Sequence, residues 1–204
     1  EMCIRDRCII VLGGSQRTCG ENKSRSSIDL PGHQQKLLEA VYATGKPIVL
    51  VMINGRPNSI NWAEKYIPAI LETWYPGSQG GTAVADVLFG DYNPGGKLTV
   101  TIPKSVGQIP FNFPAKPASQ VDGGKGVGMD GKMSRLNGAL YPFGYGLSYT
   151  TFEYSDLEIS SRLITPNQDV TITCNVTNTG KVAGDEVVQL YAVSYTHLRA
   201  HETP

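Results

Sequence analysis

The sequence predicts an α/β fold, a mainly parallel sheet flanked by helices, followed by a truncated antiparallel β-sandwich. Short uninterrupted apolar runs at 9–12 and 47–53 are typical of strands that are buried on both faces. Between these runs, the apolar residues of 37–42 have the spacing of a helix. From residue 170 onward the apolar period changes to two, which indicates antiparallel strands with one side facing solvent.

Strands and helices alternate through the N-terminal half of the chain. Asp29 and Pro31 are residue types that begin helices, and Gly45 is a residue type that ends them. Such alternation is typical of parallel strands connected by helices that cover the sheet. The predicted strands are 9–12, 47–53, 69–74 and 98–102, and the further helices are 60–66 and 82–89.

Two loops are predicted to meet at one edge of this sheet. The loops 15–27 and 76–81 both follow predicted strands. Because crossovers between parallel strands are right-handed, the loops after the strands share the edge at which α/β sheets bind ligands. The glycines at 13–14 and 77–81 could cradle a phosphate, but they form neither GxGxxG nor a Walker loop. Tight turns explain them better, which disfavours a nucleotide-binding domain.

The second half of the chain begins with a long irregular stretch. Residues 107–140 have little periodicity and contain many Pro, Gly, Asn and Lys. A loop of this length in a compact domain is usually functional or mobile. Alternating residues at 170–176, a turn at 178–181 and a strand from 186–191 then predict the opening of a β-sandwich. These strands are too few to close two sheets.

Composition excludes several classes of function. Eighteen basic residues balance eighteen acidic ones, so the chain has no electrostatic signature for nucleic acid or an anionic membrane. No apolar run approaches the roughly 18 residues that a membrane-spanning helix requires. A hydrophobic content of 40% and a charged content of 18% are those of an ordinary globular protein.

The cysteines carry no metal-binding pattern. They stand at positions 3, 8, 19 and 174, without CxxC and without a histidine at metal spacing. We therefore expect no metal and no cofactor, and we interpret the cysteines as free or buried small apolar residues. A disulfide between Cys8 and Cys19 stays open at this point.

The two ends of the chain differ from the rest. Residues 1–7 and 194–204 resemble translated sequencing-adapter read-through, and the tail lacks the alternation of the strand before it. We expect both ends to be non-native and the chain to be a fragment of a longer protein. Two of the three histidines, His197 and His201, would then have no functional role.

Three segments in order carry a family resemblance. GKPIVLVMINGRP (45–57), the PGSQGGTAVADVLFGDYNPGGKL stretch within 72–110, and YPFGYGLSYTTFEY (141–154) resemble family 3 glycoside hydrolases, in the β-glucosidase-like branch. The resemblance extends over about residues 8–193. It implies a C-terminal α/β sandwich domain at 8–140, a junction at 141–154 and an incomplete fibronectin type III-like domain at 155–193.

The resemblance also implies the reaction and the site. In this family an N-terminal TIM barrel, absent from this chain, supplies an aspartate nucleophile, and the α/β domain supplies a glutamate acid/base. The matching position is Glu21, which is followed by Ser24-Arg25 and then by 29–31 (DLP) as in family members. The chain would be part of a retaining, exo-acting β-glycosidase, secreted or periplasmic, that hydrolyses oligosaccharides or other β-glycosides and is inactive alone.

The chemistry is consistent with a glutamate there. Glycoside hydrolysis needs one carboxylic acid to protonate the leaving oxygen and a second carboxylate about 5–5.5 Å away to attack. Arg25 would lower the pKa of Glu21 if it folded back on it, so we expect Arg25 to have another partner. Weaker candidates for substrate binding are Arg25, Arg56 and Trp74, with an ion pair or core packing as their alternatives. A β-xylosidase and a non-catalytic carbohydrate-binding or scaffold module are the competing functions.

Overall fold

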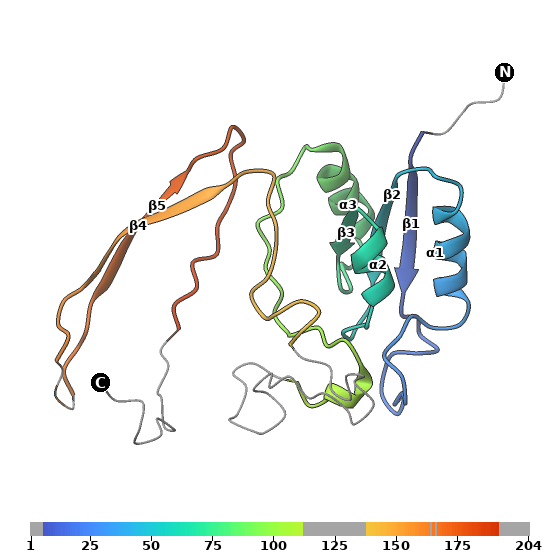
Figure 1. The fold of residues 1–204 in the computed structure, drawn as a ribbon, viewed down its shortest axis with the longest axis horizontal. Coiled ribbons are helices and arrows are strands. Elements are labelled where there is room, and N and C mark those ends of the chain that lie inside the picture. The colour runs from blue at the N-terminus through green and yellow to red at the C-terminus, as the bar shows by residue number, and fades with distance from the viewer. Residues whose placement is uncertain (1–5, 112–137, 164, 166, 192–204) are drawn as a thin grey trace, which may run out of the picture.

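The computed structural model describes residues 6–111, 138–163, 165 and 167–191 (Figure 1). A three-stranded parallel sheet with helices forms the first part, and a two-stranded antiparallel sheet forms the second. The predicted fold class is therefore confirmed. Most of the irregular stretch at 107–140, residues 1–5 of the predicted non-native N-terminal end and the whole predicted non-native tail lie outside the described residues.

The parallel sheet has the order β1-β2-β3 and consists of Cys8–Gly13, Ile48–Ile53 and Ala69–Glu72. Cys8 pairs with Ile48 in the first ladder, and Val49 pairs with Ala69 in the second. The central strand β2 is almost wholly buried, which explains its uninterrupted apolar sequence.

Each face of the sheet packs against different helices. The helices α1 (Gln34–Tyr42) and α2 (Asn61–Tyr66) cover the face that carries Leu50 and Met52. The helix α3 (Gly80–Phe89) lies against the other face, which carries Val11 and Val51. The buried core of the first face consists of Ile10, Leu12, Leu30, Leu38, Ile48, Leu50, Met52, Ile60, Ala63 and Ile67.

The first helix starts later than the sequence predicts. It begins at Gln34 rather than near Asp29 and Pro31, because Gly32 has φ of +63° and interrupts any helix there. The Gln34 side chain accepts from the Gly13 amide at 2.8 Å and donates to the Gly13 carbonyl at 2.9 Å. The start of α1 is thus fixed to the end of β1.

The third strand ends earlier than predicted, at Glu72 instead of residue 74. Trp74 has φ of 52°, in the left-handed region, which turns the chain away from the sheet. The turn is held by the Asn54 amide, which donates to the Trp74 carbonyl at 3.3 Å.

The predicted strand at 98–102 is wrong. Within this segment only Ile102 forms a bridge, an antiparallel one with Tyr141. The Leu98 amide instead donates to the Tyr145 carbonyl, and the Gly144 amide donates to the Leu98 carbonyl. The β-like pattern of the sequence reflects an extended segment that packs beside the 141–145 segment rather than a strand of the sheet.

The antiparallel sheet consists of β4 (Phe152–Ile159) and β5 (Ile172–Asn178). A register shift between Ser155 and Glu158 accommodates Asp156, whose φ is 52°. Both strands extend away from the parallel sheet, and most of their side chains are exposed (Figure 1). The further strand predicted at 186–191 is not formed in the structure.

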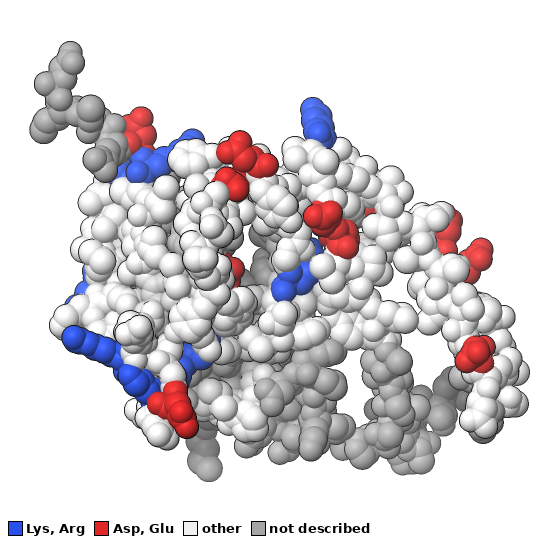
Figure 2. All heavy atoms as spheres, turned by 180° about the vertical axis from the view of Figure 1, so that it is seen from behind, with Lys and Arg blue, Asp and Glu red and all other residues white. Residues whose placement is uncertain are grey.

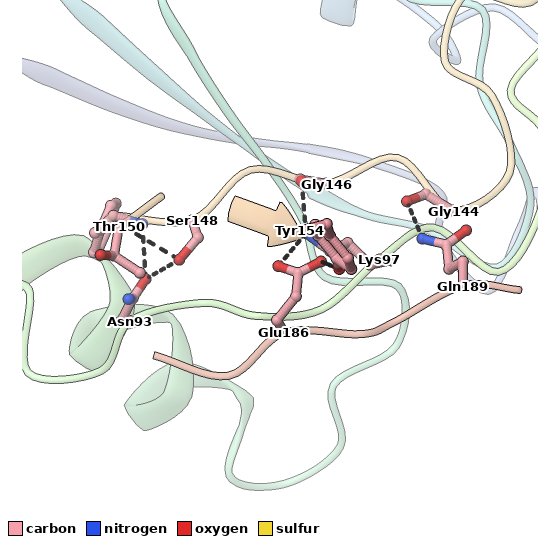
Figure 3. A network of polar contacts seen from close by, with 10 residues as sticks. Asn93, Lys97, Gly144, Gly146, Ser148, Thr150, Tyr154, Glu186 and Gln189 are labelled. Atoms are coloured by element: carbon pink, nitrogen blue, oxygen red, sulfur yellow. Dashed lines mark hydrogen bonds and ion pairs between the residues drawn. The ribbon is translucent and has the colours of Figure 1, made fainter. Parts of the chain in front are cut away.

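Three segments far apart in sequence meet between the two sheets (Figure 3). We call them the junction: residues 92–97, 144–150 and 183–189. Lys97 forms an ion pair with Glu186 at 3.3 Å and donates to the Gly146 carbonyl at 3.0 Å. Gln189 donates to the Gly144 carbonyl at 2.9 Å. Glu186 and Gln189 thus bond the other two segments of the junction instead of a strand of the antiparallel sheet.

Asn93 makes the other end of the junction. Its side-chain oxygen accepts from the Ser148 hydroxyl at 2.9 Å and the Tyr149 amide at 2.7 Å, while its amide nitrogen donates to the Ala183 carbonyl at 2.9 Å. The Asn93 side chain, which belongs to the first segment, thus contacts both of the other segments.

Cys8, Cys19 and Cys174 are free, so the bridge between Cys8 and Cys19 is not formed. Cys8 begins the six-residue strand β1 and Cys19 follows its far end. That strand separates them by roughly 17 Å, far beyond the reach of a disulfide. In the described part of the chain, no helix is long and apolar enough to cross a membrane.

Candidate functional site

Glu21 lies at the tip of a turn in the loop that follows β1. The Lys23 amide donates to the Gly20 carbonyl at 3.2 Å and closes this turn, in which Asn22 has φ of 57°. Asn tolerates that conformation better than most residues, so an asparagine at this position favours the turn. Glu21 itself is exposed. Its carboxyl therefore faces solvent from the edge at which the parallel strands end.

Arg56 holds both sides of this turn. Its Nη2 donates to the Thr18 carbonyl at 3.1 Å and to the Lys23 carbonyl at 3.0 Å. Arg56 follows the end of β2, and it is half-buried. The sequence left open whether this residue binds a sugar, a carboxylate or another domain. The structure places it on the main chain of the loop that carries Glu21.

Cys19, in the same loop, receives hydrogen bonds from Arg56 and from three other groups. Glycines 14 and 55 leave room for the contact, because a side chain at either position would meet the Tyr75 ring or the Cys19 sulfur. Burial raises the pKa of the Cys19 thiol, but hydrogen bonds from Tyr75, Gly55, Thr18 and Arg56 outweigh it and lower the pKa to about 7. The hydrogen bond to Cys19 correspondingly raises the pKa of the Tyr75 hydroxyl.

A buried amide pair fixes the far end of the loop. Asn54 is fully buried, and its Nδ2 donates to Asn58 Oδ1 at 3.0 Å and to Glu72 Oε2 at 3.3 Å. Asn58 in turn donates to the Ile28 carbonyl at 2.9 Å. The segment after β2 therefore binds the loop at its middle through Arg56 and at its end through Asn58.

Glu72 is a site residue that the sequence reasoning missed. Burial raises the pKa of its carboxyl to about 7, although hydrogen bonds from the Trp74 amide at 3.0 Å and from Asn54 act in the opposite direction. A carboxylate that directly follows the apolar run 69–71, at the carboxyl end of a parallel strand, was the available signal.

The other sequence-predicted candidates have defined partners. Arg25 donates to the Asp29 carbonyl at 2.9 Å, a partner other than Glu21, as expected. Trp74 contributes its main chain to the site through the bond to Glu72. Trp62, which the sequence analysis did not single out, packs in an aromatic cluster with Tyr42 and Tyr66, at centroid distances of 5.3 and 4.9 Å.

An apolar cavity of about 430 Å³ lies under this edge, between the sheet and α3. Its lining contains no charged side chain, so it offers no acid or base. It is lined by Val11, Val51, Ile53, Tyr75, Pro76, Gly77, Gly80, Gly81 and Val84.

In the described residues, side chains of the types that ligate metal ions are not grouped together. Among them, no group of three or more His, Cys, Asp or Glu side chains is close enough to hold a metal ion. Positive and negative side chains are interspersed on the face drawn in Figure 2, without a broad patch of one sign. The chemistry available at this edge is that of carboxyl groups, a thiol and hydrogen-bond donors.

The comparison with known protein families covers the α/β part of the chain. The profile of the Glycosyl hydrolase family 3 C-terminal domain matches residues 4–149, more than half of the chain. The chain belongs to glycoside hydrolase family 3. The family resemblance of the three sequence segments is thereby confirmed.

Curated members of glycoside hydrolase family 3 match nearly the whole chain. A β-xylosidase of Formosa agariphila is 49% identical over 186 residues, which are 91% of this chain and 25% of that protein. A periplasmic β-glucosidase of Salmonella typhimurium is 45% identical over 201 residues, 94% of this chain and 25% of that protein. The chain thus spans about a quarter of the length of these relatives.

Solved structures of two β-glucosidases also superpose on most of this chain. A β-glucosidase from Erythrobacter marinus superposes with a TM-score of 0.74 at 38% identity, covering 88% of this chain and 24% of that one. A β-glucosidase from Listeria innocua in complex with glucose superposes with a TM-score of 0.72 at 31% identity, covering 88% and 25%.

Proposed function

We propose that this chain forms part of a retaining, exo-acting β-glycosidase that removes terminal β-linked sugars, with Glu21 as its general acid/base. The observation that carries the proposal is the placement of Glu21: an exposed carboxyl at the tip of a turn that Arg56 holds on both sides. Relatives named β-glucosidase and β-xylosidase support the class of reaction.

In this mechanism Glu21 acts twice. As an acid, it donates its proton to the glycosidic oxygen while the bond from that oxygen to the anomeric carbon breaks and a second carboxylate attacks the carbon. As a base, the resulting carboxylate takes a proton from the water that releases the sugar from the covalent intermediate. The attacking carboxylate would be an aspartate of a TIM barrel outside this chain, so the chain alone would be inactive.

The charges around the turn suit an acid that must hold a proton. Lys23, Arg25 and Arg56 would each stabilise the Glu21 carboxylate if they formed an ion pair with it. All three instead donate to main-chain oxygens of the loop. In a retaining enzyme the nucleophile would then stand about 5–5.5 Å from the Glu21 carboxyl.

The decisive variant is Glu21→Gln in the complete enzyme. Loss of general acid catalysis slows the reaction by about 10²–10⁴-fold when the leaving group is poor, and far less when an activated aryl leaving group departs without protonation. Glu39→Gln, an exposed glutamate on α1, is the matched control and should leave both rates unchanged. Equal losses of Glu21→Gln on both substrates would overturn the assignment.

The sugar is a separate question, because the two curated relatives carry different names. We propose a β-glucosidase, with a β-xylosidase as the second candidate favoured by the relative that is 49% identical. Values of kcat/KM for matched aryl β-glucosides and β-xylosides, measured on the complete enzyme, decide between them. Activity on neither would favour a non-catalytic carbohydrate-binding or scaffold module.

We propose a periplasmic or secreted location, which the relative named as a periplasmic β-glucosidase supports. The upstream coding sequence tests this proposal and the missing barrel together. It should encode a signal peptide and then a TIM barrel with an aspartate in a loop at its C-terminal face.

A further inference from the structure

We infer that Arg56 is a positioning residue for the acid/base glutamate, holding the turn of Glu21 in place without touching the substrate. This inference rests on the proposed role of Glu21 and adds to it the residue through which the protein controls where that carboxyl stands. It also assigns a role to the NGRP motif after β2.

The contact geometry distinguishes this anchor from an ordinary surface arginine. One nitrogen, Nη2, bonds the carbonyl three residues before Glu21 and the carbonyl two residues after it. The guanidinium also bonds the Cys19 sulfur in the same segment. Every one of these acceptors lies between Thr18 and Lys23, so the guanidinium closes the base of the turn and leaves its tip to Glu21.

The anchor itself stands on a rigid support. Asn54 and Asn58, on either side of Arg56, are 0% and 3% exposed and bond each other at 3.0 Å. The Tyr75 ring packs where a side chain at residue 55 would lie, which holds the main chain next to Arg56. The main chain at Arg56 is therefore fixed to the buried end of β2. The loop that Arg56 holds is, in contrast, exposed.

Positioning of this kind affects turnover more than binding. A misplacement of about 1 Å can reduce a rate by about 10²-fold when the group must reach a reacting atom. Loss of Arg56 should lower kcat on substrates that need protonation by about 10–100-fold and change KM little. Lysine keeps the charge but loses the planar fork, so Arg56→Lys should recover part of the rate and Arg56→Ala none of it.

The first experiment measures the loop itself and needs no activity. Hydrogen exchange of the Cys19 and Lys23 amides, which the structure bonds to the Ser15 and Gly20 carbonyls, is compared in this chain and in its Arg56→Ala variant. We expect about 10-fold faster exchange at both amides, with the β2 amides unchanged as the measure of folding. Arg17→Ala, another loop cation, is the matched control. Unchanged exchange in Arg56→Ala would overturn the inference.

The second experiment asks whether Arg56 acts through Glu21. In the complete enzyme, Arg56→Ala should lower kcat on a poor leaving group and spare the activated aryl glycoside. Combined with Glu21→Gln it should cause no further loss, because residues acting as a unit are not additive. Equal loss on both substrates, or a fully additive double variant, would reduce Arg56 to a structural residue. An unaltered Glu21→Gln enzyme would instead refute the proposed function and leave the loop measurement valid.

Discussion

At the scale of single residues, two glutamates at one sheet edge have opposite environments. Glu21 is exposed on a turn, whereas Glu72 is half-buried at the end of β3 and accepts from Asn54 and the Trp74 amide. A carboxyl that must reach a substrate has to be accessible, and one that holds a framework has to be enclosed. These environments suit Glu21 to the proposed acid/base role and Glu72 to the support of the edge.

The burial of Glu72 predicts a stability that falls as the pH rises. Because the pKa of this carboxyl rises from 4.5 to about 7 on folding, the folded chain binds more protons than the unfolded chain between these values. The stabilisation is complete below pH 4.5 and is lost as the pH passes through about 7, a total of about 3 kcal/mol. Denaturation followed by tryptophan fluorescence should show this decline, and Glu72→Gln should flatten it.

Glu39→Gln serves as the control for that slope, since Glu39 is exposed on α1. It should keep the decline of the native chain. A slope that Glu72→Gln leaves unchanged would mean that another group binds the proton.

Cys19 predicts a second pH dependence, of reactivity rather than stability. Its thiol has a pKa lowered from 9.0 to about 7, because the hydrogen bonds it receives outweigh its burial. The thiolate is the reacting form, so the rate of alkylation at the Cys19 peptide should reach half its maximum near pH 7. Tyr75→Phe removes one of these hydrogen bonds and should move the midpoint upward. A midpoint that stays near 9 in the native chain would contradict the contacts described.

The residue scale also shows what sequence alone could supply. Glu21 was identifiable only from its neighbours at 24–31, because a glutamate in a polar loop is ordinarily a solvated surface residue. The role of Arg56 was not identifiable, since its acceptors are carbonyl oxygens more than 30 positions away, and every residue has one. A contact to a main-chain oxygen requires no particular residue type at the acceptor position, so the sequence does not reveal it.

At the scale of elements, periodicity predicted the buried strands and failed for extended segments. β2 was predicted because burial on both faces requires a continuous apolar sequence, and β1 because its sequence is equally apolar, although Ile9 and Val11 are 52% and 55% exposed. Residues 98–102 and 186–191 are also rich in residues that favour strands, but they bond irregular segments around 140–145 instead of a sheet ladder. Propensity indicates an extended conformation without indicating its partner.

The junction predicts a specific loss of order at 183–189. The Lys97 and Glu186 side chains are 13% and 15% exposed, and Tyr154 also donates to Glu186 at 3.2 Å. Lys97→Ala would leave a largely buried carboxylate without its partner, at a cost of about 3 kcal/mol. Hydrogen exchange at 183–189 should accelerate, while β1–β3 stay protected. Lys181→Ala, an exposed lysine in the turn after β5, should change neither, and equal effects of both variants would count against the ion pair.

At the scale of the whole molecule, the two sheets differ in what holds them. The parallel sheet has buried side chains between helices on both faces, whereas β4 and β5 form a two-stranded sheet with largely exposed faces (Figure 1). An isolated pair of strands is marginally stable in water. Their contacts with the rest of the described chain depend mainly on the polar groups of the junction.

This difference predicts unfolding in two steps for the isolated chain. The amides of β5 should exchange about 100-fold faster than those of β2, because opening the strand pair exposes little additional apolar surface while opening the parallel sheet exposes the core. On heating, the β4–β5 signal should be lost before the fluorescence change of Trp62, which packs with α1 and α2. A single cooperative transition that includes both sheets would show that the junction couples them more strongly than its hydrogen bonds indicate.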